Sequence, residues 1–349
     1  MVRLFRGSSP RPIIEYLTTD NEEGVNWVKI GDVPTSGRII TSTEEKITKE
    51  GAKKSRHVYV GDLILSNSMS YGLPYIMGIE GCIHDGWFVL RDYEQNFNKD
   101  YLCNLLISDI VQKQYKKIAA GGVVQNISSD LVNSVYISIP SLDEQRKIAG
   151  LLSLIDERIS TQNKIIDKLQ SLIKGIAQNI VRYNKANVRL SDCLSCSSST
   201  LQESDVSEHG TYPVYGANGV VGYLDNYNTE NEAIYIIKDG SGVGSTSYVM
   251  GKCSATGTLN ILRAKEGYSL QYLYYMLKVF NFEPYKTGMA IPHIYFKDYG
   301  KAKVFCPTYK EQLQYTRLLY AIDKRLTVEH GLLTSLSLQK QYLLRQMFI

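Results

Sequence analysis

The sequence predicts an α+β protein with an internal duplication, in which two homologous α/β domains are each followed by a long helix. The first observation is a repeat, because the segment 139–159 returns as 306–326 at a constant offset of 167 positions. The second is that each copy starts a stretch with heptad spacing of apolar residues, which is typical of paired helices. The third is that strand-like stretches, broken by Gly, Asn and Asp, precede each copy. We therefore expect a first domain at 1–140, a first spacer helix at 141–183, a second domain at 184–307 and a second spacer helix at 308–349.

Composition and charge place the chain among ordinary folded proteins. Hydrophobic residues make up 44% and charged residues 21% of the sequence, far from the composition of disordered chains. The formal net charge of +4 permits a polyanionic partner without requiring one, so nucleic-acid binding would depend on local basic patches. The six cysteines form no disulfide framework, the first residues lack the apolar core of a secretory signal, and no apolar run approaches the ~18 residues that span a bilayer. We expect a cytoplasmic protein.

Each domain combines strand-like stretches with one expected helix, and this mixture gives the α+β class. The helices are expected near 99–118 and 269–280. The stretches rich in β-branched and aromatic residues are 27–30, 63–65, 87–90, 233–237 and 258–262. Weaker matches continue upstream of the repeat: Gly121 with Gly288 and Ile127 with Ile294 at an offset of 167, Tyr101 with Tyr272 at 171, and Val2, Arg3 and Leu4 with Val188, Arg189 and Leu190 at 186. The changing offset indicates insertions in two domains that have diverged.

Each spacer helix carries an apolar seam with alternating steps of four and three residues. Each follows a proline, Pro140 or Pro307, and has acidic residues in its first turn, as suits a helix N-terminus. Two helices of about 40 residues, each ~60 Å long, can form an antiparallel coiled coil if the halves are related by a pseudo-twofold axis. Gln162 and Glu329 interrupt the seams in the same register, so we predict that they meet in one polar layer. The seam residues are Ile148, Leu152, Ile155, Ile159, Gln162, Ile166 and Leu169 in the first helix, and Leu319, Ile322, Leu326, Glu329, Leu333 and Leu336 in the second.

The motif at the start of each spacer helix carries a family resemblance. Pro-x-x-x-Glu-Gln at 140–145 and 307–312, followed by Ile-Asp-x-Arg at 155–158 and 322–325, resembles the specificity subunit of type I restriction-modification enzymes. The stretch Gly-Ser-Ser-Pro-Arg-Pro at 7–12 is also similar to the start of that family's first target-recognition domain. The resemblance covers essentially the whole chain. This sequence differs from the family's pattern in starting without a leading helical segment and in being short.

The resemblance implies a non-catalytic subunit for DNA recognition. In that family each target-recognition domain reads one half of a split site in double-stranded DNA, and the paired helices set the distance between the domains. It further implies two methyltransferase subunits docked on the helices, together with nuclease/translocase subunits, and no membrane. S-adenosylmethionine, ATP and Mg are expected in the partner subunits, and no cofactor or metal in this chain. The expected target is bipartite and asymmetric.

Candidate DNA contacts fall in basic stretches and in glycine-containing loops. Lys and Arg suit phosphates, whereas Gln and Asn suit the edge of adenine. Two loop pairs occupy equivalent places in the domains, 66–72 with 239–246 and 121–126 with 288–293. Basic runs are also ordinary solvated faces, and such loops are also ordinary turns. The candidate DNA-binding residues are Lys53, Lys54, Arg56, Ser66, Asn67, Tyr71, Lys113, Lys116, Lys117, Gly121, Gln125, Asn126, Gly242, Ser245, Met289 and His293.

Two other functions remain open on the sequence alone. A coiled-coil adaptor that binds only proteins explains the helices equally well, but not the divergence of two repeated domains. An enzyme is poorly supported, because the nuclease-like set Asp32, Glu44 and Lys46 is absent from the second half. The loop 239–246 lacks the Lys-Ser/Thr ending of a phosphate-binding loop, and the histidines show no metal-ligand spacing. The DNA-reading interpretation is therefore preferred.

Overall fold

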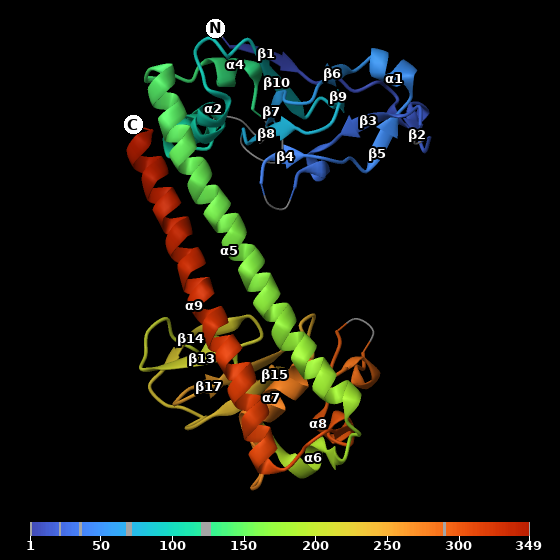
Figure 1. Cartoon of the computed structure of the whole chain (residues 1–349), viewed down its shortest axis with the longest axis vertical. Helices are drawn as coiled ribbons and strands as arrows, with labels where there is room; N and C mark the ends of the chain where they lie inside the picture. The colour runs from blue at the N-terminus through green and yellow to red at the C-terminus, as the bar shows by residue number, and fades with distance from the viewer. Residues whose placement is uncertain are drawn as a thin grey trace. The chain divides into compact units, whose positions relative to one another are not determined.

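The computed structural model describes residues 2–20, 22–34, 37–67, 72–119, 127–288 and 291–348. The chain separates into two compact units (Figure 1). Unit 1 consists of Met1–Thr161 with Leu333–Ile349, and unit 2 consists of Gln162–Leu332. Each unit therefore contains one mixed α/β domain together with one part of each long helix.

Unit 1 is built on two five-stranded sheets. The first has the order β1 (Arg3–Arg6), β10 (Trp87–Arg91), β7 (Leu63–Ser66), β8 (Pro74–Met77) and β4 (Ile39–Ile40), and the second has the order β2 (Leu17–Thr18), β5 (Glu45–Ile47), β3 (Val25–Val28), β9 (Gly81–Ile83) and β6 (Arg56–Val58). The short helices are α1 (Lys49–Lys53), α2 (Lys99–Leu106), α3 (Asp109–Ala119) and α4 (Ser129–Asn133). Apolar residues of β7 and β10 are buried on both faces, which places these strands at the centre of the domain.

The helix expected near 99–118 is two helices, α2 and α3. Asn98 caps α2, because its side chain accepts from the Tyr101 N–H at 3.0 Å. The chain then turns at Ser108, whose hydroxyl donates to the Leu105 carbonyl at 2.6 Å and so competes with continued helical hydrogen bonding. The single-helix expectation was wrong because the apolar spacing of 99–118 does not reveal this local bond.

Unit 2 repeats the central sheet of unit 1. Its strands β12 (Leu194–Ser198), β18 (Leu259–Ala264), β15 (Ala233–Ile237) and β16 (Thr246–Val249) follow the same antiparallel order as β1, β10, β7 and β8. The remaining strands are β14 (Gly219–Leu224), β13 (Tyr212–Gly216) and β17 (Ser254–Ala255) in one sheet, and β11 (Val188–Arg189) with β19 (Lys303–Val304) in another. The helices are α6 (Leu190–Cys193), α7 (Leu270–Lys278) and α8 (Phe296–Tyr299).

The start of the first domain does not align as the sequence match suggested. Arg3 and Leu4 belong to β1, which pairs with β10, and this is the place that β12 takes beside β18 in unit 2. Val188 and Arg189 instead form β11, which pairs with β19. The three-residue identity at the offset of 186 is therefore misleading, because three residues do not specify which strand they pair with.

The two long helices, α5 (Leu142–Tyr183) and α9 (Tyr309–Met347), run antiparallel in each unit. In unit 1, Asp156 forms an ion pair with Lys340. Ile148, which precedes Asp156 on α5, lies near Met347, which follows Lys340 on α9. In unit 2, Gln162 bonds Glu329, while Ile173 and Ile180 share a core cluster with Leu319. All the seam residues named from the sequence are buried or half-buried. Lys340 also lies in the seam, and its ion pair with Asp156 neutralises its charge there.

The polar layer predicted between Gln162 and Glu329 is present. The Gln162 amide donates to the Glu329 carboxylate and, at 3.0 Å, to the Glu329 backbone carbonyl. Arg325 forms an ion pair with the same carboxylate from one turn away. The hydrogen bond from Gln162, followed by the charge of Arg325, lowers the pKa of Glu329. A buried carboxylate is thus held ionised inside the helix pair.

The glutamine of each Pro-x-x-x-Glu-Gln motif joins its long helix to its own domain. Gln145 is fully buried; it accepts from the Asn98 N–H at 2.9 Å and donates to the Pro140 carbonyl at 3.0 Å. Gln312 makes the equivalent bonds to Ser269 and Pro307, both at 2.9 Å. Because these groups are buried, each amide satisfies backbone atoms that would otherwise lack partners. The glutamine of the motif therefore has a structural role: it connects the start of each long helix to the preceding domain.

Within the part of the chain that the structure describes, no helix is both long and apolar enough to cross a membrane.

Candidate nucleic-acid interface

In unit 2 the two glycine-containing loops predicted from the sequence lie side by side. The Ile294 N–H donates to the Lys238 carbonyl at 2.9 Å, and the Gly240 N–H donates to the Pro292 carbonyl at 3.0 Å. The side chains also meet, since His293 Nδ1 lies 2.6 Å from Asp239 Oδ1. Loops far apart in the sequence thus form one continuous surface.

Unit 1 joins its corresponding loops by the same backbone bond. The Ile127 N–H donates to the Asn67 carbonyl at 2.8 Å, and these residues are the counterparts of Ile294 and Lys238 at the offsets of 167 and 171. The duplication has therefore preserved the junction between the loops. The loop residues predicted to contact DNA at Tyr71, Gly121, Gln125, Asn126 and Met289 lie outside the described residues.

The loop surface of unit 2 combines partly exposed polar side chains with glycines. The side chains of His293 and Asp239 are each 35% exposed, and Ser245 is exposed. Gly242 is half-buried; Gly244 has a φ of +91° and packs over the Phe282 ring, so a side chain there would be both strained and crowded. An imidazole oriented by a carboxylate leaves its other nitrogen available for a hydrogen bond to a ligand. This arrangement suits recognition of a base edge.

Two predicted contacts in unit 1 are not supported. Ser66 and Asn67 are 0% and 4% exposed. The Leu73 N–H donates to the Ser66 hydroxyl at 3.0 Å, and the Asn67 amide donates to the Asp85 carbonyl at 2.8 Å. Both side chains are therefore buried and serve the fold of the loop. Sequence alone shows their chemistry but not their burial.

The basic stretch of the first domain lies on α1 and β6. Lys53 is in the last turn of α1, and Lys54 caps that helix. The Lys54 amine bonds the Tyr16 hydroxyl, an interaction that raises the pKa of Lys54, and it lies 4.6 Å from the centre of the Tyr16 ring. The Arg56 guanidinium lies 5.4 Å from the centre of the Phe5 ring. Lys53 and Lys54 are exposed and Arg56 is half-buried, so their charges can face a phosphate backbone.

Asp85 gathers further basic residues that the sequence did not single out. Ser9 donates to Asp85 Oδ1 at 2.8 Å, which lowers the pKa of Asp85, and Arg11 reaches Oδ2 at 3.4 Å. Arg6 donates to the Asp85 backbone carbonyl at 3.2 Å. The Arg11 side chain remains 83% exposed. The only signal in the sequence was the Gly-Ser-Ser-Pro-Arg-Pro stretch, which was used for the family and not for contacts.

A groove of about 860 Å³ opens beside Asp85. Its walls include Arg11, Trp27, Lys29 and His84. Burial lowers the pKa of His84, so its ring is favoured in the neutral form, in which one nitrogen accepts from the Ile30 N–H at 3.2 Å. Cationic side chains at the rim and apolar rings beneath are the chemistry expected of a surface that receives DNA.

The lysines of α3 form a separate exposed group. Lys113, Lys116 and Lys117 all face solvent, while Val111 and Tyr115 of the same helix are buried. The helix thus presents one basic face. We retain these lysines as candidate phosphate contacts only.

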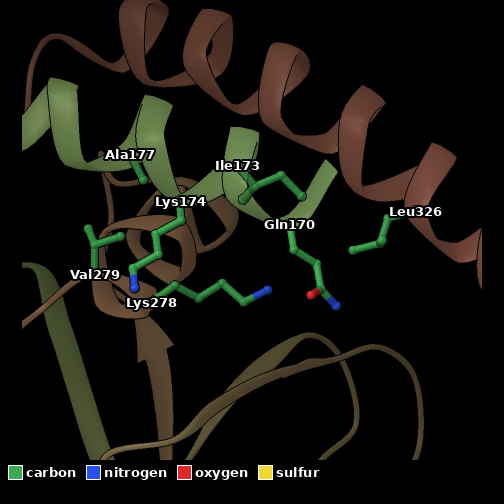
Figure 2. A pocket seen from close by; sticks show the side chains of 7 residues that line it. All are labelled: Gln170, Ile173, Lys174, Ala177, Lys278, Val279 and Leu326. Carbon is green, nitrogen blue, oxygen red and sulfur yellow. The ribbon is translucent and has the colours of Figure 1, made fainter. Parts of the chain in front are cut away.

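A smaller pocket of about 260 Å³ lies in unit 2 between α5 and α7 (Figure 2). Ile173, Ala177 and Val279 give it an apolar lining, and Lys174 and Lys278 add two amines. The Lys278 amine lies 5.0 Å from the centre of the Tyr274 ring. A pocket of this composition fits an apolar side chain with a carboxylate nearby better than it fits a nucleotide base.

The residues and loop considered for an enzymatic function can be placed in the described structure. Asp32 of the nuclease-like set accepts from the backbone N–H groups of Lys29, at 2.6 Å, and Glu44, at 3.0 Å, so its carboxylate closes a local turn. Among the residues with a described structure, His, Cys, Asp and Glu form no group of three that suits a metal ion. The loop 239–246 is followed by strand β16 and not by a helix, unlike a phosphate-binding loop.

The architecture thus defines a class: a chain with two homologous domains, each joined to one pair of antiparallel helices. Comparison with known proteins identifies that class. The family described as type I restriction modification DNA specificity domain matches the chain twice, at residues 10–171 and 184–338. The chain belongs to this family.

Individual relatives agree with that assignment. The chain is 20% identical over 330 residues to the specificity subunit of the type I restriction enzyme EcoprrI from Escherichia coli, covering 86% of this chain and 80% of that protein. It is 24% identical over 261 residues to a putative type I specificity subunit from Mycoplasma genitalium, covering 68% of each. The crystal structure of a type I S subunit from M. genitalium aligns over 100% of this chain and 94% of that one, with a TM-score of 0.61 and 17% identity. At that identity the structural likeness shows the shared fold.

Proposed function

We propose that this chain is the DNA-recognition subunit of a type I restriction-modification complex and that each of its domains reads one half of a bipartite, asymmetric site. The observation that carries the proposal is the duplicated loop junction, Ile127 with Asn67 and Ile294 with Lys238. A junction preserved in two domains whose exposed residues differ is what two readers of different half-sites require. In this proposal the domains at 1–140 and 184–307 recognise DNA, and the helices at 141–183 and 308–349 set the gap.

We assign the contacts by chemistry. Lys53, Lys54, Arg11 and the α3 lysines suit phosphate contacts, which position the protein without reading sequence. His293, oriented by Asp239, suits base readout in the second half-site. In unit 1 the corresponding reading loop falls at 121–126, where Gln125 and Asn126 offer the chemistry that suits adenine.

We place the docking of methyltransferase subunits on the outer faces of the long helices. Both helices keep large apolar side chains exposed outside the seam, and two of these positions correspond by the repeat: Leu151 with Leu318, and Ile165 with Leu332. Their exposed fractions are 41%, 52%, 37% and 45%, so all four side chains are available for contact with a partner. Two equivalent apolar faces suit two copies of one partner. The pocket of Figure 2 offers a separate apolar surface in unit 2, with the amines of Lys174 and Lys278 beside it.

The chemistry of modification and cleavage is assigned to the partners. A second solved structure, from a study of complex assembly and conformational transition of the type I R-M system, aligns with this chain with a TM-score of 0.59. S-adenosylmethionine, ATP and Mg would be bound by methyltransferase and nuclease subunits, and this chain would contribute no catalytic group. The complex is proposed to act in the cytoplasm on cellular and incoming DNA.

Methylation mapping tests the proposal directly. Genomic DNA from cells that express this chain with its cognate methyltransferase should show methylated adenine or cytosine in one split, asymmetric motif with an undefined gap. Cells that express the methyltransferase alone are the control and should lack that motif. A contiguous or palindromic motif would contradict the assignment of one half-site to each domain. Retention of methyltransferase binding with no DNA preference would instead favour the protein-only adaptor.

A further inference from the structure

The pocket of Figure 2 has an apolar floor built from three helices of unit 2. Ile173 and Ala177 of α5 are 3% and 1% exposed, and they meet Val279 at the end of α7 and Leu326 of α9, which are both half-buried. The cavity of about 260 Å³ is smaller than the usual site of a whole cofactor or drug-sized ligand. Its size and lining suit a single aliphatic side chain.

The mouth of this pocket is positively charged and rich in hydrogen-bond donors. Lys174 and Lys278 contribute two amines and Gln170 contributes an amide, and among the described residues that line the pocket none is acidic. The Lys278 side chain extends from the end of α7 toward Gln170 (Figure 2). Its amine lies 5.0 Å from the centre of the Tyr274 ring, which contacts it from below in the same unit. A carboxylate is the group that such a set of donors binds best.

The sequence explains why neither amine is neutralised by its own helix. Lysines on a helix commonly pair with acids three or four positions away. Those positions hold Gln170, Ser171, Ala177 and Gln178 around Lys174, and Tyr274, Tyr275, Asn281 and Phe282 around Lys278. Asp323 of α9 precedes Leu326 by one turn, but its carboxylate accepts from the Tyr275 hydroxyl at 3.4 Å. The two positive charges therefore remain available to a ligand.

Unit 1 does not repeat this combination of residues. At the repeat offsets, Gln341 corresponds to Lys174, Ile107 to Lys278 and Lys340 to Ile173. The equivalent of the apolar floor is thus a lysine, and Asp156 neutralises it through an ion pair. Two unneutralised amines over an apolar floor are consequently a property of unit 2 and not of the duplicated scaffold.

We propose that this pocket binds the carboxy-terminal residue of a partner polypeptide. Its aliphatic side chain would enter the floor, and its terminal carboxylate would contact Lys174 and Lys278. A terminal residue carries both groups on one Cα, which suits a small cavity with donors at its mouth. The inference goes beyond the recognition of DNA and does not depend on it. Because unit 1 lacks the two amines, one such partner binds per chain, in contrast to the two equivalent apolar faces proposed for the methyltransferase.

Methyl NMR on the full chain tests the proposal. The probe is the acetylated peptide Gly-Ser-Gly-Leu with a free carboxyl terminus, and the reporter is the labelled methyl group of Ile173, assigned by its absence from Ile173→Val. We expect a saturable shift of this signal with a dissociation constant of about 1 mM or tighter. The same peptide with an amidated terminus should bind at least about tenfold more weakly, since it loses the charged hydrogen bonds. A free-acid peptide that ends in serine should also bind more weakly, because it lacks the anchor.

Substitutions in the protein supply the matched control. Lys174→Gln and Lys278→Gln remove one charge each from exposed positions and should each weaken the free-acid peptide several-fold, but not the amidated peptide. Lys164→Gln, also exposed on α5 but outside the pocket lining, should leave the affinity unchanged. Thermal unfolding of each variant shows whether the fold is retained.

Three outcomes would overturn the proposal. Equal affinity for the acid and the amide would show that the amines do not bind the terminus. Isovalerate binding as tightly as the peptide would identify a site for a small carboxylate and not for a polypeptide. No shift at Ile173 up to about 10 mM peptide, in a chain that is folded by its other methyl signals, would show that the pocket does not take this ligand. None of these results bears on DNA recognition, which is tested separately by methylation mapping.

Discussion

Asp85 joins three stretches of the first domain through both its side chain and its backbone. The carboxylate binds Ser9 and Arg11, and the carbonyl accepts from Arg6 and Asn67. The stability of this turn therefore controls where two arginines present their charge. In unit 2, Asp239 has a comparable role. Its carboxylate contacts His293 and orients the imidazole ring, which is partly exposed to solvent.

At the Lys53 position we expect a phosphate contact. Lys53→Ala should weaken binding to all DNA sequences alike and reduce the slope of log affinity against log salt by about 1. Lys147→Ala, on the exposed face of α5, is the matched control and should leave the slope unchanged. Binding titrations at several salt concentrations, with the methyltransferase present, measure both. An unchanged slope for Lys53→Ala would place this lysine away from DNA.

At the His293 position we expect a base contact. His293→Ala should relax the preference at one base pair of the second half-site, at a cost of about 1–3 kcal/mol in discrimination. Asp239→Asn should have a smaller effect in the same direction, because it loosens the ring without removing it. Methylation rates on targets with single substitutions measure both. A uniform loss on every target would show that His293 serves the fold of the loop.

The long helices show what an element-level pattern can and cannot predict. Heptad spacing over more than three heptads was enough to predict the seam and the meeting of Gln162 with Glu329, because the period of burial is set by the helix itself. The strands at 63–65 and 233–237 were also predicted close to their observed bounds. The break at Ser108 and the Asp85 cluster were not, because they depend on one side-chain bond and on partners more than 70 positions away.

Substitutions of two nearby leucines of α5 should distinguish an effect on stability from an effect on methyltransferase binding. Leu152 is 0% exposed and Leu154 is 60% exposed. Leu152→Ala should lower the free energy of unfolding by about 2–5 kcal/mol, because it leaves a cavity in the unit 1 core. Leu154→Ala should change it by no more than about 0.5 kcal/mol, but should weaken methyltransferase binding. Denaturant unfolding and a pull-down with the methyltransferase measure the two effects, and a loss of stability in both variants would contradict the distinction.

The buried Glu329 predicts a pH dependence of the helix pair. Because its folded-state pKa is lowered, its contribution to stability is present above the ordinary carboxyl pKa near 4.5 and is lost as the pH falls through the lowered value. The difference in thermal midpoint between the wild type and Glu329→Gln should therefore be largest near neutral pH and shrink below about pH 4.5. Calorimetry from pH 3.5 to 7.5 measures this. A difference independent of pH would mean that the carboxylate is not held ionised.

At the scale of the whole chain, each compact unit draws on both long helices. Unit 2 is one unbroken stretch of sequence, whereas unit 1 needs the last part of α9 to complete its core. Phe348, which is 6% exposed, packs on Tyr101 with ring centres 5.1 Å apart, and Met347 packs against the same cluster. A residue next to the C-terminus thus belongs to the core of the first domain.

This arrangement predicts a selective effect of one distant substitution. Phe348→Ala should destabilise unit 1 by about 3–5 kcal/mol, since it removes a buried ring. Unit 2 should keep its stability because it contains no residue of 333–349. Hydrogen exchange resolved by peptide distinguishes the two, with Tyr342→Ala, 62% exposed on the same helix, as the control. Equal loss in both units would contradict the division.

The same arrangement reverses the usual order of maturation on the ribosome. Domains generally fold as they emerge, from the N-terminus onward. Here all the residues of unit 2 are translated before Met347 and Phe348. The core of unit 1, most of which is translated first, is therefore the last to be completed. A polypeptide truncated before Met347 would keep all the residues of unit 2 but would leave the core of unit 1 incomplete and open to proteases.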